Sequence, residues 1–214
     1  DLHTAAVHRY NLPQIRIAAD NPYLVELAMA FGAPVIVESP LRDGSMRELA
    51  AARGTPMLLL EAGEALRFDQ ISIDVGAEGI KRVLAHIGMI PADDGLASVG
   101  IPARANRSTW VRAPRGGIAH RERRSGDVVR EGDRLAIVTG LFGEDAMEMA
   151  SPIDGIVIGH ATLPVVNQGD ALFHIAEVAN LQQAGERVDS ITDAIRASTP
   201  AGAAEPMLDE DEVY

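Results

Sequence analysis

The sequence predicts an α/β layer structure with a largely parallel sheet, followed by a small β-barrel. Two observations carry this prediction. In residues 1–90, short apolar segments alternate with segments whose apolar residues recur at helical spacing, which is typical of a sheet covered by helices. In residues 108–178, one turn-and-strand pattern occurs twice, which indicates a quasi-two-fold barrel.

The clearest strand of the α/β part is the apolar run Met57–Leu60. It is framed by Gly54-Thr55-Pro56 and by Gly63, as expected of a strand that is buried on both faces. Glu61 follows directly, at the expected carboxyl end of the strand. Ligands of open α/β sheets bind beyond these strand ends, so Glu61 is a candidate catalytic residue. The alternative is a strand-end carboxylate that points into water.

The other elements follow from the same kinds of pattern. Asn21 or Asp20 caps a helix that begins at Pro22 and ends at Gly32. Further strands are expected at residues 1–4, 14–18, 34–38 and 70–74, and further helices at residues 43–53 and 77–87.

Changes of composition predict where the domains divide. Turn and linker residues gather between Pro91 and Pro102, and the tail becomes acidic near its end. We therefore expect the α/β part at residues 1–95, a linker at 96–107, the barrel at 108–178, and a short helix with an acidic tail at 179–214.

The barrel prediction depends on the repeated pattern V-V-x-x-G-D-x-L. It occurs at Val128–Leu135 and again at Val165–Leu172, and each Gly-Asp pair predicts a tight turn that leads into a strand. The segments Pro114–Ile118 and Pro152–Ile156, which precede the two copies, also match each other. Each unit is expected to bury its apolar face against its twin.

Composition excludes several classes of protein. A formal net charge of −12 leaves no basic stripe for nucleic acid. No apolar run approaches a membrane span, and the sequence has no cysteine and no signal-peptide pattern. We therefore expect a cytoplasmic protein without nucleic-acid or membrane partners. Because the chain begins with Asp1 rather than Met, we also expect it to be the interior of a longer protein.

The segment Ala146-Met147-Glu148-Met149 approaches the A-M-K-M hairpin of biotin carrier domains. Glu148 stands where those domains have lysine, and the single lysine of the chain, Lys81, lies in the α/β part. Without an amine in the barrel, attachment of biotin or lipoate is excluded, and so is a swinging-arm carrier.

Two histidines raise the question of a metal site. His3 follows Asp1-Leu2 at an expected strand end, where it is either a metal ligand or a structural residue. The only H-x-x-E pattern, His174 to Glu177, has ligand spacing for a helix. It lies in an expected strand, where residues three apart point to opposite faces, so we expect no zinc site there.

Three features in this order resemble the succinylglutamate desuccinylase/aspartoacylase family of zinc-dependent deacylases. They are D-L-H at residues 1–3, G-x-P-x-x-x-x-E-x-G at residues 54–63, and the terminal barrel. The resemblance covers residues 1 to 178 and implies the C-terminal part of such a protein. It implies a partial zinc-carboxypeptidase-like sheet with flanking helices, followed by a small all-β lipoyl-like (barrel-sandwich) domain.

The resemblance also implies roles for two residues. In the family, the histidine of D-L-H is one of three zinc ligands and the glutamate of E-x-G is the general base, which implies a metal role for His3 and a catalytic role for Glu61. The other two ligands come from an upstream G-x-H-x-x-E segment that this sequence lacks. The implied cofactor is zinc, and we expect the chain alone to be inactive.

The activity implied is hydrolysis of the amide bond of an N-acyl amino acid or a similar small amide. The expected partner is that small molecule, and the expected assembly is a homo-oligomer. One alternative is a non-enzymatic binding or assembly module in which the barrel is the functional part. Another is a zinc carboxypeptidase acting on peptides, which the barrel disfavours because it should narrow access to the site.

Overall fold

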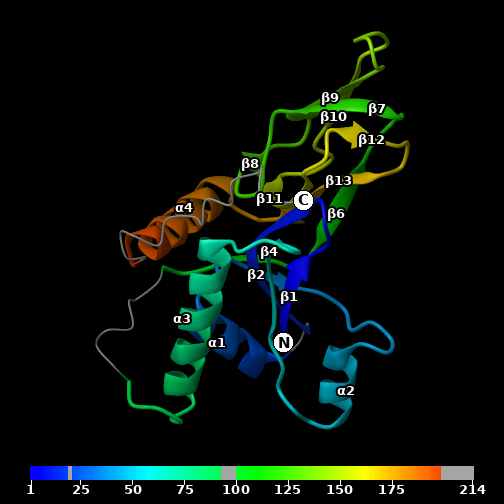
Figure 1. The fold of residues 1–214 in the computed structure, drawn as a ribbon. Helices are drawn as coiled ribbons and strands as arrows, with labels where there is room; N and C mark the ends of the chain where they lie inside the picture. The colour runs from blue at the N-terminus through cyan, green and yellow to red at the C-terminus, as the bar shows by residue number, and fades with distance from the viewer. Residues whose placement is uncertain (19–20, 93–99, 199–214) are drawn as a thin grey trace, which may run out of the picture.

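The computed structural model describes residues 1–18, 21–92 and 100–198, with side chains up to residue 193. These residues form two sheets and four helices (Figure 1). The strands are β1 (Leu2–Ala5), β2 (Arg9–Ile17), β3 (Val35–Glu38), β4 (Leu59–Glu64), β5 (Ala103–Ala105), β6 (Ser108–Arg112), β7 (Gly117–Arg121), β8 (Val128–Val129), β9 (Arg134–Thr139), β10 (Met147–Ala150), β11 (Gly155–Ala161), β12 (Val165–Val166) and β13 (Ala171–Glu177). The helices are α1 (Pro22–Phe31), α2 (Met46–Ala52), α3 (Gln70–His86) and α4 (Leu181–Ser198).

The larger sheet has nine strands, with the path β1-β4-β2-β11-β13-β6 and with β3, β5 and β8 attached beside it. Strand pairs β1–β4, β2–β3 and β3–β5 are parallel, whereas β2 runs antiparallel to β4 and to β11. The predicted mixed α/β fold is therefore confirmed. The predicted largely parallel sheet is found in the α/β part, where β2–β4 is the antiparallel exception. The strands from residues 108–178 that join this sheet through β11 pair in the antiparallel sense.

Local capping explains where α1 begins and ends. The Asn21 side chain accepts the backbone N–H groups of Tyr23 and Leu24, and Gly32 ends the helix with φ of 76°. A left-handed φ of this kind costs glycine little, which makes it a common helix terminator. Both predicted ends of this helix are confirmed.

The predicted strand at residues 70–74 is wrong, because these residues form the first turns of α3. The Asp69 carboxylate caps the helix by accepting the Ser72 N–H at 3.1 Å. Ile71 and Val75 are four residues apart, so a helix places both on one face. Both side chains join the core that covers the sheet, and this favours helix over strand.

The repeated pattern forms the same turn in both copies. The Asp133 carboxylate accepts the Arg130 N–H at 3.0 Å, and the Asp170 carboxylate accepts the Asn167 N–H at 2.8 Å. The glycine before each aspartate has φ of 87°. Each turn leads into a strand, β9 or β13, as predicted. The classification of residues 108–178 as a lipoyl-like barrel-sandwich stays a prediction.

Hydrogen-bonded strands connect the two predicted domains. In the antiparallel pair β2–β11, Asn11 lies opposite Gly159. Strand β5 belongs to the expected linker at 96–107, yet it pairs with β3 of the α/β part. A buried cluster joins β2, β3, β5, β11, β13 and α4; it contains Leu12, Val35, Val37, Ala103, Ile156, Ile158 and Val188. One core therefore spans the predicted boundary, although the division into domains itself stays a prediction.

The last helix is longer than the predicted short helix, since α4 runs for 18 residues. Its residues Val188 and Ile191 are buried. The expected acidic tail lies outside the described residues. None of the described helices has the length and apolar character needed to cross a membrane.

Two glycines at matched positions of the repeat generate a stability prediction. An added Cβ at Gly117, which has φ of 151°, would overlap the Thr139 carbonyl oxygen, and one at Gly155 would overlap that of Ala176. We expect Gly117→Ala and Gly155→Ala each to lower the free energy of unfolding by about 1–3 kcal/mol, because overpacking displaces the neighbouring strand.

Urea denaturation followed by circular dichroism measures this loss. Gly116→Ala is the matched control, because its added Cβ would lie 3.5 Å from the nearest atom, in ordinary contact. Equal stability of Gly116→Ala and Gly117→Ala would show that the close strand approach is not what requires glycine.

Candidate active site

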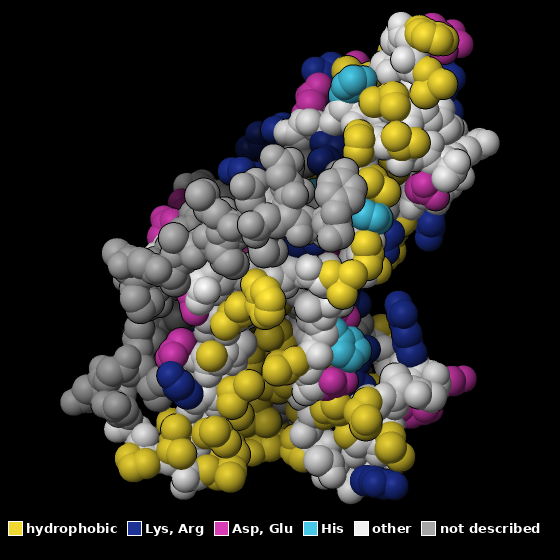
Figure 2. All heavy atoms as spheres, in the orientation of Figure 1, with side chains coloured by type: hydrophobic (Ala, Val, Ile, Leu, Met, Phe, Trp, Pro, Cys, Tyr) yellow, Lys and Arg dark blue, Asp and Glu magenta, His cyan; other side chains and the backbone are white. Residues whose placement is uncertain are grey.

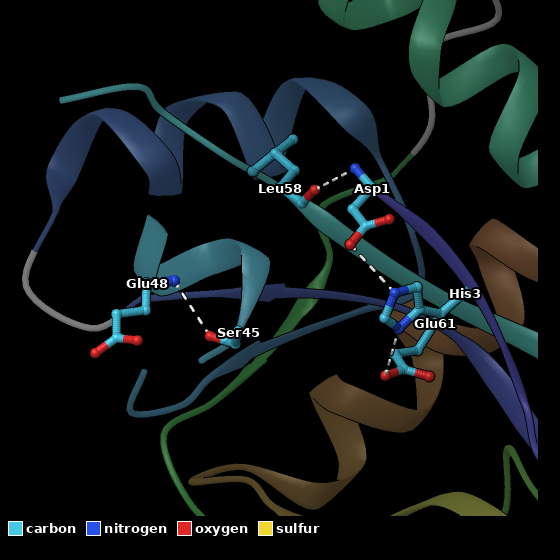
Figure 3. Close-up of polar contacts among 6 residues, drawn as sticks. All are labelled: Asp1, His3, Ser45, Glu48, Leu58 and Glu61. Carbon is cyan, nitrogen blue, oxygen red and sulfur yellow. Dashed lines mark hydrogen bonds and ion pairs between the residues drawn. The ribbon is translucent and has the colours of Figure 1, made fainter. Parts of the chain in front are cut away.

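The structure brings His3 and Glu61 together on neighbouring strands. They lie opposite each other in the parallel pair β1–β4. The distance from His3 Nδ1 to Glu61 Oε1 is 3.7 Å, and that from His3 Nε2 to Asp1 Oδ2 is 3.1 Å (Figure 3). The His3 side chain is 49% exposed and that of Glu61 only 18%. A single strand pairing therefore juxtaposes the two residues singled out from the sequence.

Glu61 does not lie at the end of its strand, as the sequence led us to expect. Strand β4 begins at Leu59 and continues to Glu64, so Glu61 is its third residue. The strand extends past Glu61 because it is paired on both sides, with β1 and with β2. Met57 and Leu58, in the predicted strand, precede β4. A central position with two pairing partners holds the carboxylate more rigidly than a strand end would.

A second side chain contacts the Glu61 carboxylate. Asn11 on β2 is buried, and its Nδ2 donates a hydrogen bond of 3.2 Å to Glu61 Oε2. Across from Asn11 on β11, an added Cβ on Gly159 would lie 2.7 Å from Asn11 Oδ1. The absence of a side chain at Gly159 thus leaves room for Asn11. Sequence analysis missed Asn11, since nothing in its local pattern distinguishes it from a structural residue.

Glu61 and Asn11 open onto a polar cavity of about 560 Å³. Both halves of the chain line it. The α/β half contributes Arg9, Arg16 and Arg42, and the other half contributes Trp110, Arg112 and His174. Asp170 is the other acidic residue of the lining. Four arginines therefore face two carboxylates, which makes the cavity electropositive.

The Arg16 guanidinium is largely removed from water in the cavity, and this burial disfavours its positive charge. Burial lowers the pKa of Arg16, the Glu61 carboxylate opposes that shift, and the positive charge of Arg42 adds to it. Since burial disfavours the charged form of any group, an anion in the cavity would stabilise this guanidinium.

Stacked side chains form one wall of the cavity. The Trp110 and His174 rings stack with centroids 4.1 Å apart and planes at 12°, and the Arg9 guanidinium lies 4.6 Å from the centroid of Trp110. Burial, with the charges of Arg16, Arg9 and Arg42, lowers the pKa of His174 to about 3. His174 is therefore neutral near pH 7, and its Nε2 pairs with Ser108 Oγ at 2.9 Å.

The two residues of the H-x-x-E pattern have different partners and do not share a site. His174 and Glu177 both lie in strand β13, as the sequence predicted. Glu177 pairs with Arg107 at 3.4 Å, whereas His174 stacks on Trp110.

The described residues do not by themselves fit a zinc site. They contain no group of three or more His, Cys, Asp or Glu side chains that could hold a metal ion. His3 has only the carboxylates of Asp1 and Glu61 beside its ring. A catalytic zinc site uses three protein ligands, so these residues alone do not complete one.

A second cavity beside β1 is apolar and has a volume of about 460 Å³. Figure 2 shows apolar side chains gathered over the region of α3 and the N-terminal strand. The lining includes Leu2, Tyr23, Leu27, Phe31, Ile80 and Leu84. Acid–base chemistry needs titratable groups, so the candidate active site is the polar cavity at Glu61.

The N-terminal part of the chain matches one known family. Residues 1–87 match the model of one family, and its description is Succinylglutamate desuccinylase/Aspartoacylase catalytic domain. The family resemblance predicted from the sequence is confirmed. The comparison with curated protein sequences finds no match.

Solved structures also resemble this chain. A succinylglutamate desuccinylase/aspartoacylase from Rhodobacter sphaeroides is 27% identical, with a TM-score of 0.72 over 84% of this chain and 58% of that one. The ectoine utilization protein EutE (DoeB) from Ruegeria pomeroyi, in its product-bound structure, is 19% identical, with a TM-score of 0.73 over 83% and 57%. At 19% identity, the second likeness shows the fold alone. The chain spans less than two thirds of the length of either structure.

The buried histidine generates a prediction about pH. The pKa of His174 is lowered from 6.5 to about 3 in the folded chain, so between these values the unfolded chain binds more protons than the folded one. The free energy of unfolding therefore falls as the pH decreases from 6.5 towards 3, by up to about 1.4 kcal/mol per pH unit for one such group.

Urea denaturation of the wild type and of His174→Asn at pH 7 and pH 5 checks this linkage. The variant loses the ring stack and is less stable at both pH values, but its loss of stability between them should be smaller. An identical pH dependence in the two proteins would contradict the linkage.

Proposed function

We propose that the protein of which this chain forms part hydrolyses the amide bond of an N-acyl amino acid or a similar small amide, and that the reaction depends on zinc. One observation carries the proposal. His3 and Glu61, given these roles by the family resemblance, lie opposite each other in the β1–β4 pair, and Glu61 lines the polar cavity. The match of residues 1–87 to the family's catalytic domain supports it.

The proposed role of Glu61 is general base. Its Oε2 accepts a hydrogen bond from Asn11 Nδ2, which orients the carboxylate, while Oε1 lies on the side of His3. A carboxylate so placed accepts a proton from an attacking water and passes it to the leaving amine. Proton transfer of this kind needs a fixed donor–acceptor geometry, and the paired strands on both sides of β4 provide it.

The proposed role of His3 is to hold zinc. When bound, zinc lowers the pKa of a coordinated water and polarises an amide carbonyl. Because His3 is a single imidazole and the described residues form no complete site, the other ligands must be supplied from outside these residues.

The alternative of a binding or assembly module, with the barrel as the functional part, has less support. Trp110, Arg112 and His174 from the barrel half line the same cavity as Glu61. We propose that residues 108–178, a lipoyl-like barrel-sandwich, serve as one wall of the active site. We further propose a cytoplasmic homo-oligomer, which fractionation and light scattering of the whole protein would test.

The first functional prediction compares two single variants of the whole protein. Glu61→Gln should lower kcat by about a hundred- to ten-thousandfold, because glutamine has nearly the same shape but accepts no proton at neutral pH. Its zinc content should not change, since Glu61 is assigned as base and not as ligand. His3→Ala should lose zinc and activity together. Hydrolysis of a panel of N-acyl amino acids and zinc by mass spectrometry provide both measurements.

Glu177→Gln is the matched control, because Glu177 is a partly exposed carboxylate paired with Arg107 and does not line the cavity. It should keep both zinc and kcat. Near-normal kcat in Glu61→Gln would remove Glu61 from the mechanism, and full zinc content in His3→Ala would remove His3 from the metal site.

The second functional prediction concerns residues 1–214 alone. With His3 as the single assigned ligand, the purified chain should contain no stoichiometric zinc and should hydrolyse no N-acyl amino acid. Zinc analysis after dialysis measures the first, and an amine-release assay the second. Tight zinc binding by this chain would mean that Asp1 or Glu61 is a ligand, contrary to the roles proposed.

A further inference from the structure

Strand β2 contains a bulge beside the candidate active site. Asn11 pairs with Gly63 of β4. Three residues further on, Gln14 pairs with Glu61, so between these pairs two residues of β2 lie opposite one residue of β4. Gly63 and Glu61 are two residues apart and belong to one face of the sheet, which their partners share. Without the bulge, Asn11 and Gln14 would point to opposite faces, because they are three residues apart. The bulge therefore places the Asn11 side chain on the face of Glu61.

Pro13 explains why the bulge lies at this point of β2. It is one of the two residues that lie between the paired positions. Proline has no N–H to donate to a neighbouring strand, and within sheets it is found at edges and at bulges. Strand β2 is not an edge, since it pairs with β4 on one side and with β3 and β11 on the other. A bulge thus accommodates Pro13, and with it the sequence specifies the face that Asn11 uses.

Asn11 is the residue through which the sheet holds the Glu61 carboxylate. Within the described part of the chain, only Asn11 Nδ2 donates a hydrogen bond to that carboxylate, at 3.2 Å from Oε2. His3 lies on the side of the other oxygen, at 3.7 Å from Oε1. A loss of the Asn11 amide therefore leaves Glu61 free to rotate about its side-chain bonds.

Gly159 of β11 determines whether the Asn11 amide keeps this place. The two residues are paired, and an added Cβ at Gly159 would lie 2.7 Å from Asn11 Oδ1. Its next neighbours, the His174 Cβ and the Tyr10 carbonyl oxygen, would both be 3.5 Å away, in ordinary contact. Gly159 is not one of the described glycines with positive φ, so its backbone conformation suits any residue. The Asn11 side chain alone is what requires glycine at position 159.

From this arrangement we infer that Asn11 and Gly159 are positioning residues for the proposed base. The bulge directs Asn11 at Glu61, and Gly159 of the barrel half keeps the Asn11 amide in the orientation that donates to the carboxylate. The inference rests on the proposed function and adds a control of the base from the barrel half. Residue 159 does not line the cavity, so its effect on Glu61 passes through Asn11.

Kinetics of the whole protein with an N-acyl amino acid test the role of Asn11. Asn11→Ala should lower kcat by about ten- to hundredfold, the range for a lost hydrogen bond to a charged group. KM should change little, because Asn11 acts on the base and not on the substrate. In a Glu61→Gln background the same substitution should cause no further loss of kcat, since the group that Asn11 positions is already inactive.

A second pair of variants tests the role of Gly159. Gly159→Ala should lower kcat about as much as Asn11→Ala, because the added methyl group turns the amide away from Glu61. In an Asn11→Ala background, Gly159→Ala should have no effect on kcat or on the urea midpoint of unfolding, since the atom that it would overlap is gone. Gly116→Ala is the matched control, because its added Cβ makes only ordinary contacts, and it should keep the wild-type kcat.

Side-chain amide signals in the NMR spectrum of the isotope-labelled whole protein test the contact without catalysis. The Asn11 signal is the one that disappears in Asn11→Ala. It should shift in Glu61→Gln, which removes the charge of its acceptor, and in Gly159→Ala, which turns the amide away. In Gly116→Ala it should stay at the wild-type position. Circular dichroism confirms that each variant is folded.

The outcomes separate the two proposals. If the Asn11 signal responds as described while the wild type hydrolyses no amide, the positioning of Glu61 stands and the proposed deacylase function fails. If amides are hydrolysed but Asn11→Ala lowers kcat equally with and without Glu61→Gln, the function stands and the inference is overturned. Wild-type kcat in Gly159→Ala, or an unshifted Asn11 signal in that variant, would overturn it as well.

Discussion

The antiparallel pairing of β2 with β11 is the constraint on which the candidate site depends. It places Asn11 opposite Gly159 and thereby directs the Asn11 amide towards Glu61. It also brings the barrel half close enough for Trp110 and Arg112 to line the cavity. Further along β2, the strand leaves β11 and pairs with β3 instead. One strand therefore contacts the proposed base, lines the polar cavity and joins the α/β core.

The parts of the structure that sequence predicts well are those with local causes. The cap at Asn21, the helix end at Gly32 and the paired Gly-Asp turns all depend on a few adjacent residues, and all are present. The error at residues 70–74 is also local, since Ile71 and Val75 fit either a strand or a helix, and the cap at Asp69 decides for the helix.

The parts that sequence predicts poorly depend on strand register. His3 and Glu61 were found through their motifs, but Asn11, Arg9 and Trp110 belong to no motif. Their shared position follows from pairings between segments that are 100 or more residues apart, such as Tyr10 with His160. Nothing in a local pattern specifies such a register. The same reason explains why the antiparallel β2–β4 pair was not predicted, because the sense of that pair follows from the path of the whole chain.

Strand β1 leaves an unpaired strand edge in the described part of the chain. It is the outermost strand of its sheet path, with one hydrogen-bonded neighbour among the described strands. Leu2 is 59% exposed beside the apolar cavity. Backbone groups at an unpaired strand edge recruit strands from other molecules, and an adjoining apolar surface strengthens that association. The isolated chain is therefore prone to edge-to-edge self-association and aggregation in concentrated solution, and a charged substitution at Leu2 is the simplest way to suppress it.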